Sequence, residues 1–265
     1  MKRTPSSSTV QSPVCVAQCR ARIVDDAAPL HFVGHWDGRG RAKLANNGQS
    51  AVLTFSDRPF RPFVVGGPLT GVYLFEQLHF HWGPDDTVGC EHLFDGRAHS
   101  MEAHLVHYNV RYGSFTRALA KPDGLAVVAL LLDAQATSGA DWEPLQPIVR
   151  ALRYIRQPDS SEITLPADCL RWMSGLELGR HYYTYHGSMT TAPYRESVTW
   201  LIYRTPIFIS SRQTAAFRRL LRRSKPGKDT LITSNFRPVQ RSTAGGDAFR
   251  LVFVRDSVPT VRAKL

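Results

Sequence analysis

The chain is organised around residues 77–107, which contain the runs Gln77-Leu78-His79-Phe80-His81-Trp82, Glu91-His92 and Glu102-Ala103-His104-Leu105-Val106-His107. His79 and His81 are two residues apart, so both imidazoles project from the same face of an extended strand. His104 has the same spacing from Glu102 and from Val106. Two neighbouring strands can therefore direct three imidazoles to one point, as a zinc ion with three protein ligands and one water requires.

Polar neighbours that can orient these histidines occur at the same spacing. Gln77 lies two residues before His79, and Glu102 lies two residues before His104. Each can accept a hydrogen bond from the N–H of the ring nitrogen that does not bind metal. A His-x-His pattern also occurs in ordinary strands as a packed or surface pair. The two patterns alone therefore leave a metal site and a structural pair open.

Four blocks of the sequence together resemble the alpha-class carbonic anhydrases. They are residues 77–83, 91–92, 102–109 and Gly187-Ser188-Met189-Thr190-Thr191-Ala192-Pro193. The intervals between the blocks fit that family, and the resemblance extends over residues 11–238. It implies a mostly β (α+β) single domain with a central, largely antiparallel twisted sheet, peripheral helices and a conical zinc cavity. Residues 1–10 are then a disordered lead-in, residues 11–256 the carbonic anhydrase domain and residues 257–265 a tail.

The resemblance implies zinc-dependent, reversible hydration of carbon dioxide to bicarbonate and a proton by zinc-bound hydroxide. The metal ligands are then His79, His81 and His104, and sulfonamides or anions are expected to inhibit at the zinc. Three neutral imidazoles leave the zinc its double charge, which lowers the pKa of bound water to about 7, an effect for which carbonic anhydrase is itself the type example. Thr190 and Glu91 match the family's catalytic pair, in which the threonine accepts a hydrogen bond from the hydroxide and donates its proton to the glutamate.

The resemblance also implies the residues around the metal. The substrate-binding positions are Thr191 and an apolar wall made of Val106, Val127, Met189, Val198 and Trp200. Met189 replaces a more usual leucine of nearly the same volume. Gln77, Glu102 and the backbone carbonyl near Asn235 are expected to orient the ligands. His92 and His107 match structural histidines of the family, which lie within a buried polar network.

Residues 46–50, Asn-Asn-Gly-Gln-Ser, have the composition of a turn. Many active members of the resembled family have a histidine there that transfers protons to solvent, whereas this chain has Gln49. Glutamine does not titrate, and a group with a pKa near neutrality transfers protons best. We therefore expect slow proton release. We also expect part of the cavity wall to be missing, because members of the family have a longer segment, with rim aromatics, before the block that begins at Gln11.

Composition is that of a soluble globular protein: 265 residues, 43% hydrophobic and 21% charged. The formal net charge is +11, but no nucleic-acid-binding motif accompanies the basic residues, so we expect a solvated basic face and no nucleic-acid partner. No apolar run approaches the roughly 20 residues of a membrane span, and the first residues lack the apolar core of a signal peptide. A cytoplasmic monomer without a membrane partner is expected.

The four cysteines, at positions 15, 19, 90 and 169, do not form a zinc-finger pattern. Secreted members of the resembled family often have a disulfide cysteine shortly after the Thr-Thr-Pro block. Tyr194 occupies that place here, so this disulfide is not expected.

Secondary structure follows from hydrophobic spacing. Residues 125–133 form a continuous apolar run, which predicts a strand buried on both faces. Helical spacing predicts surface helices over residues 141–155, capped by Asp141, and over residues 214–223, with Arg218, Arg219, Arg222 and Arg223 on the outside. Alternating runs predict strands within residues 29–55 and 197–204 and a last strand at residues 247–254.

Two other classes of function stay open. Non-catalytic modules that resemble carbonic-anhydrase-related proteins usually lack a zinc histidine, whereas all three are present here. A basic scaffold that binds polyanions through residues 212–228 is the second alternative. Salt-dependent retention on heparin or nucleic acid, unaffected by removing zinc, would distinguish that scaffold from the enzyme.

Overall fold

The computed structural model describes residues 11–24, 28–134, 139–158, 160–225, 228–241 and 250–252. The expected lead-in (residues 1–10) and tail (residues 257–265) lie outside these residues. The strands are β1 (Cys15–Val16), β2 (Arg22–Val24), β3 (Leu30–Val33), β4 (Arg41–Asn46), β5 (Ala51–Ser56), β6 (Phe63–Gly66), β7 (Tyr73–Trp82), β8 (Leu93–Phe94), β9 (Met101–Asn109), β10 (Leu125–Asp133), β11 (Ile163–Pro166), β12 (Tyr182–Gly187), β13 (Val198–Phe208), β14 (Leu221–Lys225), β15 (Lys228–Leu231) and β16 (Arg250–Val252).

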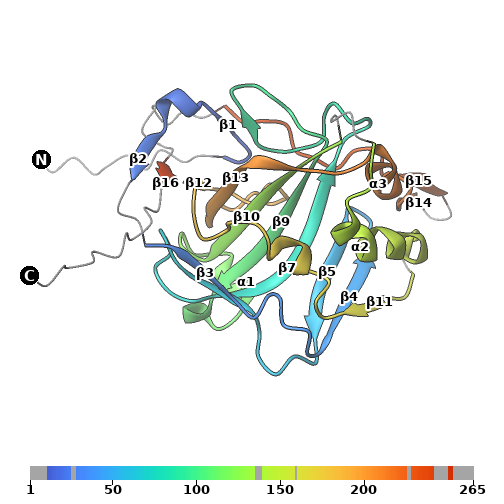
Figure 1. The fold of residues 1–265 in the computed structure, drawn as a ribbon, viewed down its shortest axis with the longest axis horizontal. Coiled ribbons are helices and arrows are strands. Elements are labelled where there is room, and N and C mark those ends of the chain that lie inside the picture. Colours follow the sequence, from blue (N-terminus) through green and yellow to red (C-terminus); the bar gives the residue numbers. More distant parts are fainter. Residues whose placement is uncertain are drawn as a thin grey trace, which may run out of the picture.

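Helices are short and lie around the sheet (Figure 1). The α-helices are α1 (Phe115–Ala118), α2 (Gln146–Ala151) and α3 (Ser211–Phe217). The 3₁₀ segments are η1 (Gln18–Arg20), η2 (Val110–Tyr112), η3 (Glu143–Leu145), η4 (Leu152–Ile155) and η5 (Arg171–Met173). In the described residues, no helix is long and apolar enough to cross a membrane.

One twisted sheet dominates the fold, in the order β11-β4-β5-β7-β9-β10-β13-β12-β16-β2, with β3 and β6 attached beside β7. The pairs β10–β13 and β16–β2 are parallel, and the other pairs of this sheet are antiparallel. Figure 1 shows β7, β9 and β10 side by side at its centre. The expected mostly β fold with a largely antiparallel sheet is confirmed.

Strand β10 lies in the middle of the core, and all nine of its residues are buried. Successive side chains of a strand point to opposite faces. Accordingly Ala126 and Val128 pack into one apolar cluster, and Val127 and Ala129 pack into another on the other face. The prediction that this apolar run forms a strand covered on both faces is confirmed.

The region predicted as a helix from residue 141 to residue 155 is helical in three consecutive segments, η3, α2 and η4. Asp141 does not cap it, because Trp142 occupies the N-cap position of η3. The Asp141 carboxylate instead accepts hydrogen bonds from the Ser210 hydroxyl and from Arg212. The predicted cap was therefore wrong.

The second predicted helix is shorter than expected. It begins after Ser210, whose hydroxyl accepts a hydrogen bond from the Gln213 backbone in a complete capping box, and it ends at Phe217. Residues 221–225 form β14 instead, which pairs antiparallel with β15, and the Leu221 N–H donates to the carbonyl of Arg156, 2.9 Å away. Tertiary hydrogen bonding overrides the helical spacing here.

Arg218 was also expected on the outside of that helix, and its side chain is only 16% exposed. Its guanidinium lies 2.7 Å from the Gly83 carbonyl and 2.7 Å from an Asp86 carboxylate oxygen. Arg222 and Arg223 lie on β14, not on a helix. At least one cation of residues 212–223, Arg218, is therefore largely buried and bonded within the fold.

The turn predicted at residues 46–50 is present between β4 and β5, and Gly48 has a φ of 80° there. The Asn47 side chain accepts hydrogen bonds from the backbone of Gln49 and Ser50. The last predicted strand is described only as β16, since its neighbours lie outside the described residues. Cys15, Cys19, Cys90 and Cys169 are free thiols.

Candidate metal centre

Neighbouring strands β7 and β9 position the three histidines. In the antiparallel register His79 lies opposite His104, and His81 lies opposite Glu102. One nitrogen from each of His79, His81 and His104 lies within 4.8 Å of the others, and the three rings are buried. Ring centroids are 4.9 Å apart for His79–His81, 5.2 Å for His79–His104 and 4.6 Å for His81–His104. The structure thus brings the three sequence-predicted ligands together.

The other nitrogen of each ring faces a hydrogen-bond acceptor. His79 Nδ1 lies 3.0 Å from Gln77 Oε1, and His81 Nδ1 lies 3.1 Å from the backbone oxygen of Asn235. His104 Nε2 lies 2.7 Å from Glu102 Oε1. Each acceptor requires a proton on that nitrogen, so the lone pair remains on the nitrogen that faces the other rings. This donor set fits zinc.

Burial keeps the ligands in the form that binds metal. Loss of hydration lowers the pKa of His79 well below its usual value, and the neighbouring rings of His81 and His104 lower it further. Burial also lowers the pKa of His81, although the Glu91 carboxylate opposes the shift. Both imidazoles are therefore neutral near pH 7, as metal binding requires.

Glu91 is buried beside the histidines. Its Oε1 accepts a hydrogen bond from the Arg237 backbone, 2.8 Å away, and lies 3.3 Å from His81 Nδ1. Its Oε2 lies 3.9 Å from His104 Nδ1 and has no hydrogen-bond partner among the described residues. Thr190 is buried too, but no hydrogen bond between Thr190 and Glu91 is formed in this part of the chain. An acceptor is thus available on Glu91.

Strand β13 holds the loop that contains Thr190. Trp200 Nε1 donates to the carbonyl of Ser188, 3.1 Å away. The same indole packs edge-on against the His104 ring, with centroids 4.9 Å apart. One tryptophan therefore links the loop before Thr190 to a candidate ligand.

The expected apolar wall residues gather on the same side of the sheet as His104. Neighbouring strands place Val106 opposite Val127, and Val127 opposite Trp200. These three belong to one buried cluster with Val198, and Met189 packs against it. Thr191 is exposed. The conical shape of the cavity stays a prediction.

Gln49 is exposed at the β4–β5 turn. Its backbone oxygen accepts a hydrogen bond from the Asn235 side chain, 2.9 Å away. The backbone oxygen of Asn235 in turn contacts His81. Gln49 is therefore connected to the candidate ligand His81 through a single residue, Asn235.

A buried polar chain extends behind Glu102, and sequence reasoning found only part of it. Glu102 Oε2 accepts hydrogen bonds from the backbone of Glu91 and His92, each at 2.8 Å, and Glu102 Oε1 lies 2.7 Å from His92 Nδ1. His92 Nε2 then lies 2.7 Å from the Tyr185 hydroxyl, which donates to Ser12 Oγ at 2.8 Å. His92 was expected in such a network, as observed. Tyr185 and Ser12 were missed, since 173 residues separate them.

The electrostatics of Glu102 explain that chain. Full burial favours the neutral carboxyl, but His92 and His104 more than offset this effect and hold the pKa of Glu102 well below its usual value. The carboxylate is therefore ionised and can accept hydrogen bonds from the surrounding N–H groups. Its place between His104 and His92 fixes the orientation of both rings.

His107, the other expected structural histidine, is separate from this centre. Its Nε2 lies 2.9 Å from His35 Nε2, and its Nδ1 lies 3.1 Å from the Leu105 carbonyl. Both rings are fully buried. Nothing in this pair faces the three candidate ligands.

Comparison with known proteins agrees with this geometry. The family model described as "Eukaryotic-type carbonic anhydrase" matches residues 2–245. Carbonic anhydrase 7 of Mus musculus is 38% identical over 231 residues, which is 87% of this chain and 84% of that protein. Mitochondrial carbonic anhydrase 5A of Rattus norvegicus is 36% identical (88% and 74% covered), and carbonic anhydrase 3 of Sus scrofa is 35% identical (82% and 81% covered). This chain therefore belongs to the eukaryotic-type, or alpha, carbonic anhydrase family.

Proposed function

We propose that this protein is a zinc enzyme that interconverts carbon dioxide with bicarbonate and a proton, within one domain formed by residues 11–256. The observation that supports this most strongly is the set of three buried imidazoles whose donor atoms lie within 4.8 Å of one another. Membership of the carbonic anhydrase family supports the same reaction. His79, His81 and His104 would hold the metal.

The residues around the ligands have separate tasks. When bound, zinc supplies a Lewis acid that makes hydroxide available from water near neutral pH, as is typical of this family. Gln77, Glu102 and the carbonyl of Asn235 hold the three rings in one orientation. Thr190 would donate a hydrogen bond from its hydroxyl to Glu91, whose Oε2 has no hydrogen-bond partner among the described residues. The threonine oxygen is then left as an acceptor that orients the attacking group.

The wall formed by Val106, Val127, Met189, Val198 and Trp200 binds the substrate. Carbon dioxide has no net dipole, so apolar contact is the interaction that can hold it. These side chains lie in or against one buried cluster on neighbouring strands. Thr191, exposed next to Thr190, completes the substrate-binding set.

Proton release is the expected slow step. Each turnover leaves one proton that must reach solvent, and a side chain with a pKa near neutrality does this best. Gln49 lies in a turn that is hydrogen-bonded to Asn235, and its side chain does not titrate. We therefore expect proton transfer to limit the maximal rate.

The basic-scaffold alternative receives little support from residues 212–228. In this segment Arg212 pairs with Asp141, Arg218 with Asp86 and Arg223 with Asp229. Non-catalytic modules of this kind usually lack a ligand histidine, whereas His79, His81 and His104 lie together here. The cytoplasmic location and the monomeric state stay predictions from the sequence.

The test is the rate of carbon dioxide hydration, measured by stopped flow, for the wild type and for Thr190→Val. The wild type should be active and inhibited by an aromatic sulfonamide. The variant should keep its zinc but lose about 100-fold in rate, the loss typical of misplacing a reacting group. An unchanged rate in the zinc-loaded variant would contradict the role given to Thr190, and an inactive, zinc-loaded wild type would contradict the proposed function.

A further inference from the structure

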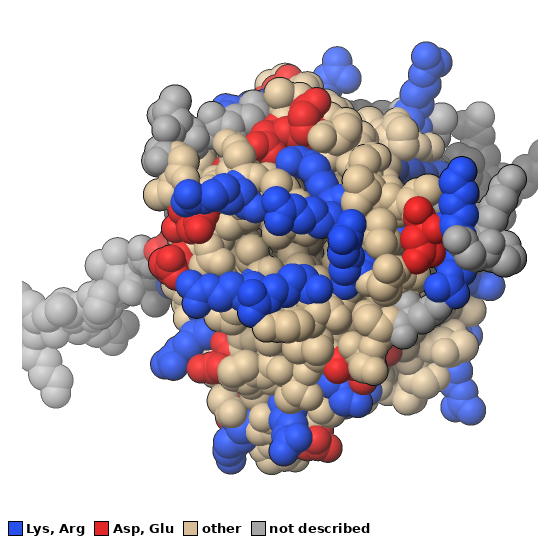
Figure 2. Space-filling view, turned by 90° about the vertical axis from the view of Figure 1, so that its right-hand side faces the viewer, with Lys and Arg blue, Asp and Glu red and all other residues tan. Residues whose placement is uncertain are grey.

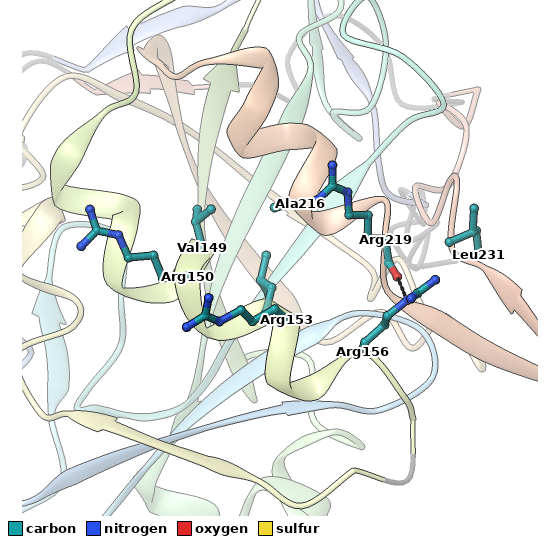
Figure 3. Close-up of a pocket in the computed structure, with 8 residues that line it drawn as sticks. Val149, Arg150, Arg153, Arg156, Ala216, Arg219 and Leu231 are labelled. Atoms are coloured by element: carbon teal, nitrogen blue, oxygen red, sulfur yellow. Dashed lines mark hydrogen bonds between the residues drawn. The ribbon is translucent and has the colours of Figure 1, made fainter.

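A groove of about 710 Å³ is lined by residues that lie outside the candidate metal centre. It is lined by Val149, Arg150, Leu152, Arg153, Arg156, Ala216, Arg219 and Leu231. Figure 3 shows that three of its arginines come from the continuous α2–η4 segment and that Arg219 follows α3. On this side of the molecule, basic side chains form two rows with a hollow between them (Figure 2).

Within the described residues, the arginines of this groove form few ion pairs. Among the described residues, Arg153, Arg156 and Arg219 have no acidic partner. Arg150 has one, Glu143 at 3.8 Å, and both side chains are more than 70% exposed. The contact of Arg156 is to a backbone oxygen, that of Arg219, at 3.2 Å. Four cations therefore stand around one hollow with little neutralising charge.

Such an arrangement costs the protein stability. Like charges three residues apart on a helix repel by roughly 0.2–0.5 kcal/mol per pair. Arg150, Arg153 and Arg156 form two such pairs in succession. Arg218, which directly precedes Arg219, is by contrast paired with Asp86 at 2.7 Å. The groove therefore leaves positive charge available to a ligand.

Its floor is apolar. Val149, Leu152 and Ala216 pack in or against the core, and Leu231 on β15 is 47% exposed. A site for a ligand that is only anionic does not require an apolar surface. A ligand that fits this groove therefore has anionic groups on its flanks and apolar groups on the side that faces the protein.

We propose that this groove binds an acidic amphipathic helix of a partner protein. The three arginines of α2–η4 recur every third residue, which spaces them by about 4.5–6 Å along the axis. Carboxylates three or four residues apart on a helix have the same spacing, about 5–6 Å. A helix whose acidic row meets these arginines turns its apolar stripe toward Val149, Ala216 and Leu231. Guanidinium groups bind carboxylates in a bidentate manner, which adds specificity.

Nucleic acid fits the groove less well. Recognition of single strands uses aromatic side chains on which bases stack, and the eight lining residues include no aromatic ring. A phosphate backbone is charged, so it would make no apolar contact with the exposed Leu231. A nucleic-acid partner is therefore an alternative for the test to exclude.

The test is fluorescence anisotropy with a synthetic helical peptide of about 18 residues, long enough to be helical alone. Glutamates are spaced three and four residues apart on one face, with leucines beside them. A scrambled peptide of identical composition and a single-stranded oligonucleotide serve as competitors, at about 0.15 M salt. The full chain should bind the ordered peptide at least about tenfold more tightly than either competitor.

Two variants separate charge from apolar contact. Arg153→Gln with Arg219→Gln should weaken peptide binding about tenfold or more, and Leu231→Ser, which leaves the charge unchanged, roughly fivefold. The matched control, Arg111→Gln with Arg117→Gln, removes two exposed cations outside the groove and should have little effect. All of these side chains are exposed, so folding is not at risk.

Three results would overturn the proposal. They are equal binding of the ordered and scrambled peptides, tighter binding of the oligonucleotide, and equal loss of binding in the groove and control variants. Carbon dioxide hydration should be unaffected in the groove variants, because none of their residues lies in the metal centre. The proposal is independent of the proposed function.

Discussion

At the scale of single residues, the chemistry of the metal centre depends on which nitrogen of each imidazole has the proton. Here an acceptor at about 3 Å fixes that choice for His79, His81 and His104. Gln77 and Glu102 could be predicted, since each lies two residues from its ligand on the same strand face. The Asn235 carbonyl is 154 residues from His81, so no local spacing indicates it, and only the family resemblance did.

A histidine at position 49 should speed turnover. Gln49→His places a group with a pKa near 6.5 at the turn that contacts Asn235, so we expect the maximal rate to rise by about tenfold or more without a change in zinc content. Stopped-flow carbon dioxide hydration in dilute buffer measures this. Imidazole buffer should raise the wild-type rate in the same way. If neither change has an effect, proton transfer through residue 49 is not the limiting step.

The buried pair His35–His107 should make the fold sensitive to acid. Burial lowers the pKa of His107 to about 4 and that of His35 well below its usual value. The unfolded chain takes up these protons near pH 6.5 and the folded chain does not, so stability present above pH 6.5 is lost as the pH falls toward about 4. His107 alone accounts for about 3 kcal/mol of this loss.

Urea unfolding at several pH values tests that expectation. The free energy of unfolding of the wild type should fall more steeply below pH 6.5 than that of His107→Gln, which removes one titrating group but retains hydrogen-bonding capacity. Parallel curves for the two proteins would show that His107 does not have the lowered pKa.

At the scale of elements, sequence reasoning worked where one pattern dominated. The apolar run of β10 could only be buried on both faces, and it is. It failed at residues 218–223, where helical spacing predicted more helix. There Leu221 bonds to Arg156 and Arg218 pairs with Asp86, 132 residues away. Such contacts are fixed by the tertiary structure, and a local window of sequence does not contain them.

The capping box of α3 should contribute measurably to stability. Ser210 accepts a hydrogen bond from the Gln213 backbone and donates to Asp141, and α3 has only seven residues. Ser210→Ala should lower the free energy of unfolding by about 1 kcal/mol, and Ser210→Thr should restore most of it. Urea denaturation measures both. Equal stability of the alanine and wild-type proteins would contradict the role of this cap.

At the scale of the whole molecule, the sequence predicted the family and the fold, and both are confirmed. The distribution of the charge of +11 could not be predicted in the same way. Residues 212–228, the segment of the alternative polyanion-binding scaffold, contain three arginines in ion pairs, Arg212, Arg218 and Arg223. Three arginines for which the described residues offer no acidic partner, Arg153, Arg156 and Arg219, line the groove between α2–η4 and α3, and Arg219 belongs to that same segment. Which charges are neutralised depends on partners far away in sequence.

Metal analysis of the purified protein tests the central claim most directly. Elemental analysis, after dialysis against a trace of zinc and then against metal-free buffer, should find one zinc per chain in the wild type. It should find far less in His104→Ala, which removes one of three ligands. The control variant His186→Ala makes the same substitution at an exposed histidine outside the site, and it should keep the full zinc content. A wild-type protein that stays free of zinc, or a His104→Ala variant that binds zinc equally well, would contradict the assignment of this centre.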